Sequence, residues 1–228
     1  MNSFLQKIFF NPKKPQNKFR KSFSQDGEDM ILSSLFDDLG GRKKGFYIDI
    51  GALHPFRFSN TAHFYDIGWN GINIEPTPTA IEVFNRYRKR DINLNFGIAD
   101  KEGSLVFYCF DEPALNSFSK EISLERNETT HYKIIDTIKI PVFPLHQILH
   151  KYLPQGVHID FLNIDVEGLD IAVLQSNDWD KYIPEFILIE DIINVENLTT
   201  SNVYNFLIIK GYALKAKNER TMIFHYAK

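Results

Sequence analysis

The sequence predicts a doubly wound α/β fold, in which helices cover both faces of a mainly parallel sheet. Apolar runs typical of buried strands alternate along the chain with segments in which apolar residues recur at helical spacing. Four of the runs, at residues 45–50, 71–75, 158–165 and 185–191, have an acidic residue at their last or next-to-last position. Strands that alternate with helices pair in parallel, so we expect these acids to meet at one edge of the sheet.

Spacing and turn residues give the order of the elements. Apolar positions in 30–36 share one helical face, and two glycines at 40–41 end that helix. Residues 111–137 are polar and irregular, and are our candidate for a mobile cover over a site. The other expected elements are strands at 45–50, 71–75, 92–98, 104–110, 138–143, 158–165 and 185–191, helices after 59–61 and at 79–89, 145–152, 169–175 and 200–210, and a C-terminal hairpin of 211–215 and 221–226 that adds an antiparallel edge.

Length and charge indicate one folded domain that follows a basic arm. The chain of 228 residues can bury one sizeable core, and we expect the domain to span residues 22–228. Residues 1–21 contain lysines and arginine but no acid, although the whole chain carries a net charge of −3. A basic arm on an acidic body argues against nucleic-acid binding. Apolar residues in the arm could contact a membrane surface, but docking of the arm on the body is the interpretation we favour.

The cysteine content and the hydropathy pattern indicate a cytoplasmic protein. Cys109 is the single cysteine, which excludes a disulfide framework and a thiolate metal cluster. Apolar runs all fall short of the roughly 18 residues that a membrane span needs. The first ten residues lack the apolar core and cleavage site of a signal peptide.

A glycine turn after the first strand and an acid after the second predict an adenosine-binding site. Gly51 follows the first strand, and Glu75 closes the next, where one carboxylate can accept both hydroxyls of a ribose. The G-x-G-x-x-G pattern is missing. Because its extra glycines let the backbone approach a pyrophosphate, this argues against NAD or FAD and is compatible with S-adenosyl-L-methionine (SAM). Asp100 is placed to accept from an adenine amino group or to cap a helix, and Asp49 is interpreted as an organiser of the glycine turn.

Acids at the ends of four strands repel one another and need a cationic partner, either a sulfonium with an ammonium group or a divalent metal ion. Methyl transfer also requires a group that removes the proton of the acceptor. The Asp165-Val166-Glu167 segment could instead bind a metal ion, but the sequence contains no clear metal-ligand spacing and we assign no metal ligand. The candidates for the base or for an acceptor clamp are His54, Asp165, Glu167 and Glu190.

Several polar and glycine-containing motifs follow one another in a fixed order. They include Ser24-Gln25-Asp26-Gly27-Glu28-Asp29, Tyr47-Ile48-Asp49-Ile50-Gly51-Ala52, Ser59-Asn60-Thr61, Ile74-Glu75-Pro76 and Asn163-Ile164-Asp165-Val166-Glu167-Gly168. This ordered series resembles the FkbM family of SAM-dependent methyltransferases over residues 22–191. The resemblance implies a Rossmann-like fold of the class I methyltransferase type, with Asp165 and Glu167 facing the acceptor. With the residues above, the candidate cofactor-binding set is Gln25, Glu28, Asp49, Gly51, Asn60, Thr61, Glu75 and Asp100.

The resemblance further implies O-methylation, often of sugar hydroxyls. We therefore expect an O-methyltransferase that acts on a sugar or nucleotide-linked sugar in surface polysaccharide or glycoconjugate biosynthesis, with acceptor specificity located in residues 111–137. Alternative functions are methylation of a lipid, phosphoryl or small-molecule oxygen, a nicotinamide-dependent oxidoreductase, and a non-catalytic binding module.

Overall fold

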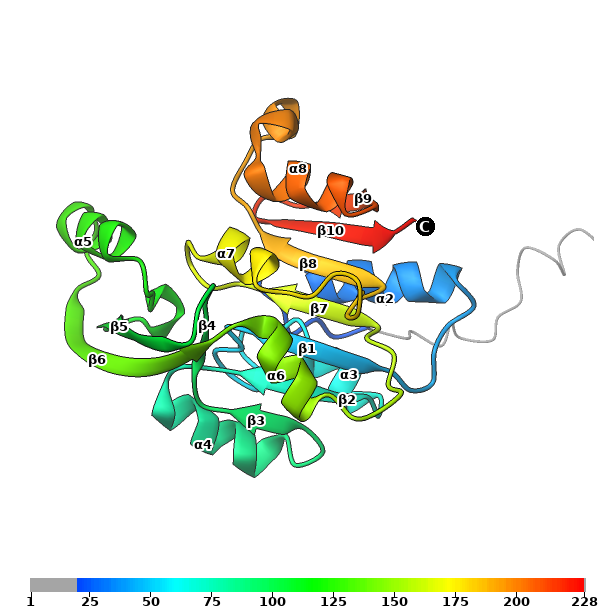
Figure 1. Cartoon of the computed structure of the whole chain (residues 1–228), viewed down its shortest axis with the longest axis horizontal. Helices are drawn as coiled ribbons and strands as arrows, with labels where there is room; N and C mark the ends of the chain where they lie inside the picture. The colour runs from blue at the N-terminus through cyan, green and yellow to red at the C-terminus, as the bar shows by residue number, and fades with distance from the viewer. Residues whose placement is uncertain (1–19, 228) are drawn as a thin grey trace, which may run out of the picture.

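The computed structural model describes residues 20–227 and shows a seven-stranded sheet beside a three-stranded one (Figure 1). Strand β1 (Phe46–Ile50) pairs in parallel with a neighbour on each side, and the chain adds strands first to one side of β1 and then to the other. That reversal of strand order is the switch point of a doubly wound fold. In spatial order the strands are β3 (Ile92–Leu94), β2 (Asn70–Ile74), β1 (Phe46–Ile50), β7 (Phe161–Ile164), β8 (Phe186–Glu190), β10 (Thr221–Tyr226) and β9 (Tyr212–Lys217).

Helices cover both faces of the large sheet because its strands are apolar on both sides. Alternate residues of β1 enter two different cores: Ile48 packs on one face, and Tyr47 packs on the other. The first core contains side chains of α6 (Leu145–Tyr152), α7 (Asp170–Gln175) and α8 (Asn202–Ile209), and the second contains those of α2 (Glu28–Asp38) and α3 (Ala62–Asp66). Figure 1 shows α6 in front of the sheet and α2 behind it. A further helix, α4 (Pro78–Tyr87), follows β2 and begins with the expected proline.

The C-terminal hairpin adds the expected antiparallel edge. Strand β10 pairs antiparallel with β8, and β9 pairs antiparallel with β10 at the end of the sheet. This confirms the predicted fold class, a Rossmann-like, mainly parallel sheet that ends in an antiparallel hairpin.

The expectation of one strand over residues 92–98 is wrong. β3 ends at Leu94, and β4 (Gly97–Ile98) belongs to the smaller sheet, where it pairs with β6 (Ile134–Phe143). Asn95 makes the break, because its side-chain amide donates to the backbone carbonyls of Glu75 (2.9 Å) and Pro76 (2.8 Å) and so turns the chain off the sheet edge.

Residues 103–143 form an insertion that projects from one side of the large sheet (Figure 1). It consists of β5 (Gly103–Phe110), a short 3₁₀ helix η1 (Pro113–Leu115), α5 (Lys120–Thr129) and β6, with β5 and β6 paired antiparallel. The interpretation of 111–137 as irregular is therefore wrong for most of its length. Ser119 caps α5 by accepting from the backbone N–H of Ile122.

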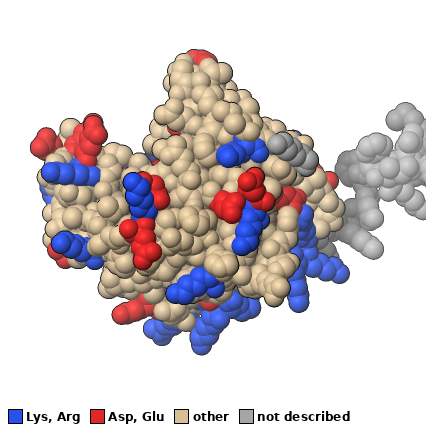
Figure 2. Space-filling view, viewed as in Figure 1, with Lys and Arg blue, Asp and Glu red and all other residues tan. Residues whose placement is uncertain are grey.

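Charged and apolar side chains are distributed unevenly over the surface. On the face in Figure 2, Lys and Arg side chains gather along the lower edge, whereas the projection above the sheet is mostly uncharged. The 3₁₀ helix η2 (Val195–Thr200) lies near α8, and Ile192 and Val195 are exposed there.

Among the described helices, none has the length and hydropathy needed to cross a bilayer. The predicted basic arm lies outside the described residues except for Arg20 and Lys21.

Candidate active site

A cavity of about 390 Å³ opens at the carboxyl ends of β1, β2, β7 and β8, under the insertion. This volume lies within the range of pockets that hold cofactors and small molecules. The chain turns away from the sheet after each of these strands, which is why residues far apart in sequence meet there. Seven of the predicted site residues line the cavity: Gln25, Asp49, Gly51, Glu75, Asp165, Glu167 and Glu190.

Gly51 forms the floor of the cavity at a position that no other residue can occupy. Its φ is 81°, and a Cβ atom built there would lie 1.7 Å from the backbone oxygen of Asp165. Its own N–H donates to the carbonyl of Ile74 at 3.0 Å. The glycine turn therefore lets β1, β2 and β7 end close together, which keeps the space above them open to a ligand.

Glu75 is buried in the cavity wall, with 4% of its surface exposed. Its Oε2 accepts from the N–H of Leu53 and its Oε1 from the N–H of Thr77, both at 2.8 Å. Burial raises the pKa of Glu75 above its ordinary value, while these hydrogen bonds act in the opposite direction. Each carboxylate oxygen keeps a further lone pair, so the side chain is held in place and can still accept hydrogen bonds from a diol.

Asp49 is held within the wall by side-chain hydrogen bonds. Its carboxylate accepts from Asn163 Nδ2 at 2.8 Å and from Thr61 Oγ1 at 2.9 Å. Asn60 in turn donates to Asn163 Oδ1 at 2.8 Å. Burial raises the pKa of Asp49. Asn60 and Thr61 thus support Asp49 and Asn163, and neither is among the residues that line the cavity.

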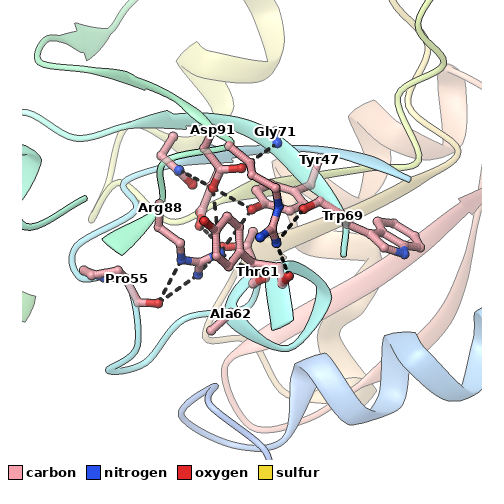
Figure 3. A network of polar contacts seen from close by, with 12 residues as sticks. Tyr47, Pro55, Thr61, Ala62, Trp69, Gly71, Arg88 and Asp91 are labelled. Carbon is pink, nitrogen blue, oxygen red and sulfur yellow. Dashed lines mark hydrogen bonds and ion pairs between the residues drawn. The ribbon is translucent and has the colours of Figure 1, made fainter. Parts of the chain in front are cut away.

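A buried arginine that sequence reasoning missed fixes the loop behind this wall (Figure 3). Arg88 is completely buried and donates to Pro55 O at 2.8 Å, to Tyr47 Oη at 3.1 Å and to the side chain of Thr61 at 3.3 Å. Asp91 lies 3.8 Å from the guanidinium and accepts from Tyr47 Oη at 2.7 Å. A buried cation requires such partners, and together they hold the residues that support Asp49. Local sequence carries no signal for this network, because it joins residues from four separate segments.

Asp165, Glu167 and Glu190, here called the carboxylate cluster, place carboxylate oxygens within 4.8 Å of one another. Arg126 of α5 binds Glu167 at 2.6 Å. Within residues 20–227, the side chains of Asp165 and Glu190 have neither a hydrogen bond nor an ion pair. The side chain of Asp165 is exposed to the space of the cavity. Protein atoms surround the cavity closely, and they desolvate the Asp165 carboxylate.

The environment of the carboxylate cluster favours protonation of two of its members. Desolvation raises the pKa of Asp165 well above its usual range, and the charges of Glu190 and Glu167 raise it further. Burial, with the charges of Glu167 and Asp170, raises the pKa of Glu190 to about 7. Carboxyl groups with raised pKa values in a cavity are typical of sites that accept or donate protons.

Strained backbone is concentrated around the cavity. Leu53, Phe58 and Glu167 all line it, and they are the non-glycine residues with positive φ in the described chain, at 53°, 54° and 54°. Such conformations cost on the order of 1–3 kcal/mol each and cluster at functional sites. The loop that carries Phe58 is tied to the insertion, because Arg57 binds Glu112 through two hydrogen bonds of 2.9 Å.

Besides Asn60 and Thr61, three further predicted site residues do not line the cavity. His54 Nδ1 accepts from the N–H groups of Phe56 and Arg57, both at 3.1 Å, so His54 organises its own loop. Glu28 is buried and accepts from Asn218 at 2.7 Å, which joins α2 to the β9–β10 turn. Asp100 is exposed in the turn before β5. The structure therefore does not bring these residues to the proposed ligand.

The residues present fit SAM. Gly51 leaves room for a ligand against the floor, Glu75 presents a fixed buried carboxylate to a ribose, and Phe96 and Ile98 supply apolar wall beside it. The carboxylates of Asp165 and Glu190, which have no bonded partner among the described residues, suit a positively charged sulfonium. Together with the strand order, these features define a class I methyltransferase that uses SAM.

Comparison with known proteins identifies the family. Residues 49–212 match the model of the methyltransferase FkbM domain, so the chain belongs to the FkbM methyltransferase family. A search of curated proteins found no match.

Solved structures to which the chain is similar are of low identity and low TM-score. Fibrillarin from Aeropyrum pernix with natively bound SAM is 13% identical, covers 86% of this chain and 74% of its own, and has a TM-score of 0.43. Precorrin-6Y C5,15-methyltransferase from Geobacter metallireducens is 10% identical, covers 92% of each chain, and has a TM-score of 0.45. An O-methyltransferase from Bacillus cereus in complex with SAH is 12% identical, covers 91% of this chain and 84% of its own, and has a TM-score of 0.42.

Proposed function

We propose that this SAM-dependent methyltransferase methylates a hydroxyl group of a sugar or nucleotide-linked sugar in surface polysaccharide or glycoconjugate biosynthesis, in the cytoplasm. The proposal includes a methyltransferase domain at residues 22–228 that follows a basic arm at 1–21. The observation that supports O-methylation most directly is the pair of carboxylates, Asp165 and Glu190, that face the cavity without a counter-ion in the described chain.

In this proposal the cofactor lies along the edge formed by β1 and β2. Glu75 accepts the ribose hydroxyls, Gly51 allows the close approach, and Gln25 and Asp49 form part of the wall. SAM supplies a methyl group on a positively charged sulfur, and its transfer to a hydroxyl oxygen leaves the electron pair of the broken C–S bond on sulfur and releases the hydroxyl proton.

One carboxylate of the Asp165–Glu190 pair then receives that proton. A carboxylate with a pKa near 7 is partly ionised at neutral pH and still basic enough to accept a proton, which is the balance that a general base needs. Carboxylates also accept hydrogen bonds from neighbouring hydroxyls, and Phe58 and Tyr132 add aromatic surface to the same cavity. A polyhydroxyl acceptor such as a sugar matches this combination of groups.

The test is transfer of a labelled methyl group from SAM to a panel of nucleotide sugars, read by mass spectrometry. We expect one added methyl group on a sugar of the panel with the wild-type protein, and none with Asp165→Asn as the matched control. Label that appears on lipid or on a phosphoryl oxygen, and on no sugar, would contradict the acceptor class. Activity that is lost with a chelator and restored by magnesium would contradict the assignment of the carboxylates as the base.

A further inference from the structure

Arg126 connects the insertion to the loop that follows β7. Its guanidinium donates to Glu167 Oε2 at 2.6 Å and to the backbone carbonyl of Leu115 at 3.2 Å. Ser117 Oγ donates to the backbone carbonyl of Glu167 at 2.7 Å. Glu167 has a φ of 54°, a strained conformation for a residue with a side chain. These contacts show that the insertion holds Glu167 in a fixed, strained position.

The other two members of the carboxylate cluster are not held in this way. Asp165 and Glu190 line the same cavity, and their side chains have no bonded partner among residues 20–227. The charged groups that face Glu190 are Asp165 and Glu167 after β7, Asp170 at the start of α7, Arg126 on α5, and Arg220 in the β9–β10 turn. Arg220 also lies 3.6 Å from Asp26, outside the cluster. In the part of the chain that the structure describes, Arg126 is therefore the cation that binds directly to a member of the cluster.

We propose, on the basis of the proposed function, that Arg126 is a positioning residue of the transfer reaction. By binding Glu167, it withdraws that carboxylate from the acceptor and leaves Asp165 and Glu190 as the pair that receives the proton. The proton that leaves the acceptor hydroxyl goes to a carboxylate oxygen of this pair, which becomes a neutral acid, and no other bond at these residues changes. The insertion thus takes part in the chemistry through one ion pair.

The positive charge of Arg126 lowers the pKa of Glu190, and the negative charge of Glu167 raises it. Removing either charge alone therefore shifts the titration of the Asp165–Glu190 pair, in opposite directions. Carboxyl ¹³C NMR titration of the protein without SAM measures the shift, with Asp165→Asn and Glu190→Gln used to assign the signals. We expect Arg126→Gln to move the titration up by about half a pH unit or more, Glu167→Gln to move it down, and the double variant to titrate between the two single variants.

Arg57→Gln is the matched control, because Arg57 ties the same insertion to a different loop through Glu112 and is not among the charges that face Glu190. We expect Arg57→Gln to leave the titration within about 0.2 pH unit of wild type. Arg126→Lys keeps the charge, and we expect it to restore most of the wild-type behaviour. The pH profile of methyl transfer should move with the NMR titration in each variant. SAM affinity should change less than about threefold, which is the size of change that loss of one exposed ion pair produces.

Equal shifts in Arg57→Gln and Arg126→Gln would overturn the proposal, because they would show that loosening the insertion, and not loss of a charge, changes the cluster. Shifts of the same sign in Arg126→Gln and Glu167→Gln would also overturn it. The titration requires neither cofactor nor acceptor. Its result therefore does not depend on the result of the labelled-methyl assay that tests the sugar acceptor.

Discussion

Strands β7 and β8 have acidic residues at both of their ends, and the surroundings of the two ends differ. At the amino ends, Arg42 donates to both Asp160 and Glu185, and the N–H of Phe46 donates to Asp160 at 2.7 Å. At the carboxyl ends, Asp165 and Glu190 face the cavity, and within the described chain neither has a bonded partner. Within residues 20–227, the same strands thus hold one set of acids with bonded partners and one set without.

The acids at the amino ends of β7 and β8 stabilise the fold, whereas the acids at the carboxyl ends are available for chemistry. A carboxylate bound by a cation and a backbone N–H has its charge compensated, so it contributes to the stability of the fold. A desolvated carboxylate without such partners destabilises its own ionised form, which raises its pKa. The raised pKa values of Asp165 and Glu190 therefore mark the carboxyl ends of these strands as the reactive side of the sheet.

The largest effect is expected from Asp165→Asn at the reactive end. Asparagine keeps the shape of the side chain but cannot accept the proton, so turnover should fall by about 10²–10⁴-fold. SAM affinity should change far less. Steady-state kinetics together with calorimetric titration of SAM measure both quantities. An equal loss of turnover and of binding would show that Asp165 is structural and would remove the distinction between the two ends.

The next effect is expected from Arg42→Met at the paired end. The substitution leaves Asp160 and Glu185 without their shared cation, and it should lower the free energy of unfolding by about 2–4 kcal/mol. Arg220→Met is the control, because it removes an exposed ion pair with Asp26 and should cost less than about 1 kcal/mol. Urea denaturation gives both values. Loss of SAM affinity in Arg42→Met, with stability unchanged, would reverse the assigned roles of the two ends.

A smaller and pH-dependent effect is expected from Glu190→Gln. The pKa of Glu190 is about 7 in the folded protein, above its ordinary value of 4.5, so the folded state binds more protons than the unfolded state between these values. The wild type therefore loses stability as the pH rises through this window, and a neutral glutamine does not. We compare the free energy of unfolding of Glu190→Gln with that of wild type at each pH. We expect this difference to be about 1–3 kcal/mol more favourable to the variant at pH 8 than at pH 4. Urea denaturation at the two pH values measures this gain. The same difference between the two proteins at both pH values would show that Glu190 is not destabilised by ionisation.

The sequence predicted the sheet and the site residues at the strand ends, because both follow from the apolar runs. The apolar runs of β1, β2, β7 and β8 end at Gly51, Glu75, Asp165 and Glu190, and parallel pairing brings strand ends together without further information. Short-range patterns of this kind can be found in a single chain. The split of residues 92–98 between two sheets was missed because it depends on where Asn95 finds its carbonyl partners.

The arginines at the site and at the paired end were not predicted, because each acts on residues distant in sequence. Arg42 binds Asp160, Arg88 donates to Tyr47, and Arg126 binds Glu167. His54 is a different case. It lies on the correct loop, but its ring nitrogen accepts from the two nearby backbone N–H groups, a local arrangement that residue type alone does not reveal.

Calorimetric titration of SAM against wild type and Glu75→Ala tests the central claim, that the cavity at the carboxyl ends of the strands holds an adenosyl cofactor. Glu75 is buried, lines that cavity and is positioned by two backbone N–H groups. We predict that Glu75→Ala weakens SAM binding by about tenfold or more, because the ribose loses a charged, desolvated acceptor. Unchanged affinity in a folded Glu75→Ala protein would contradict this account of the site.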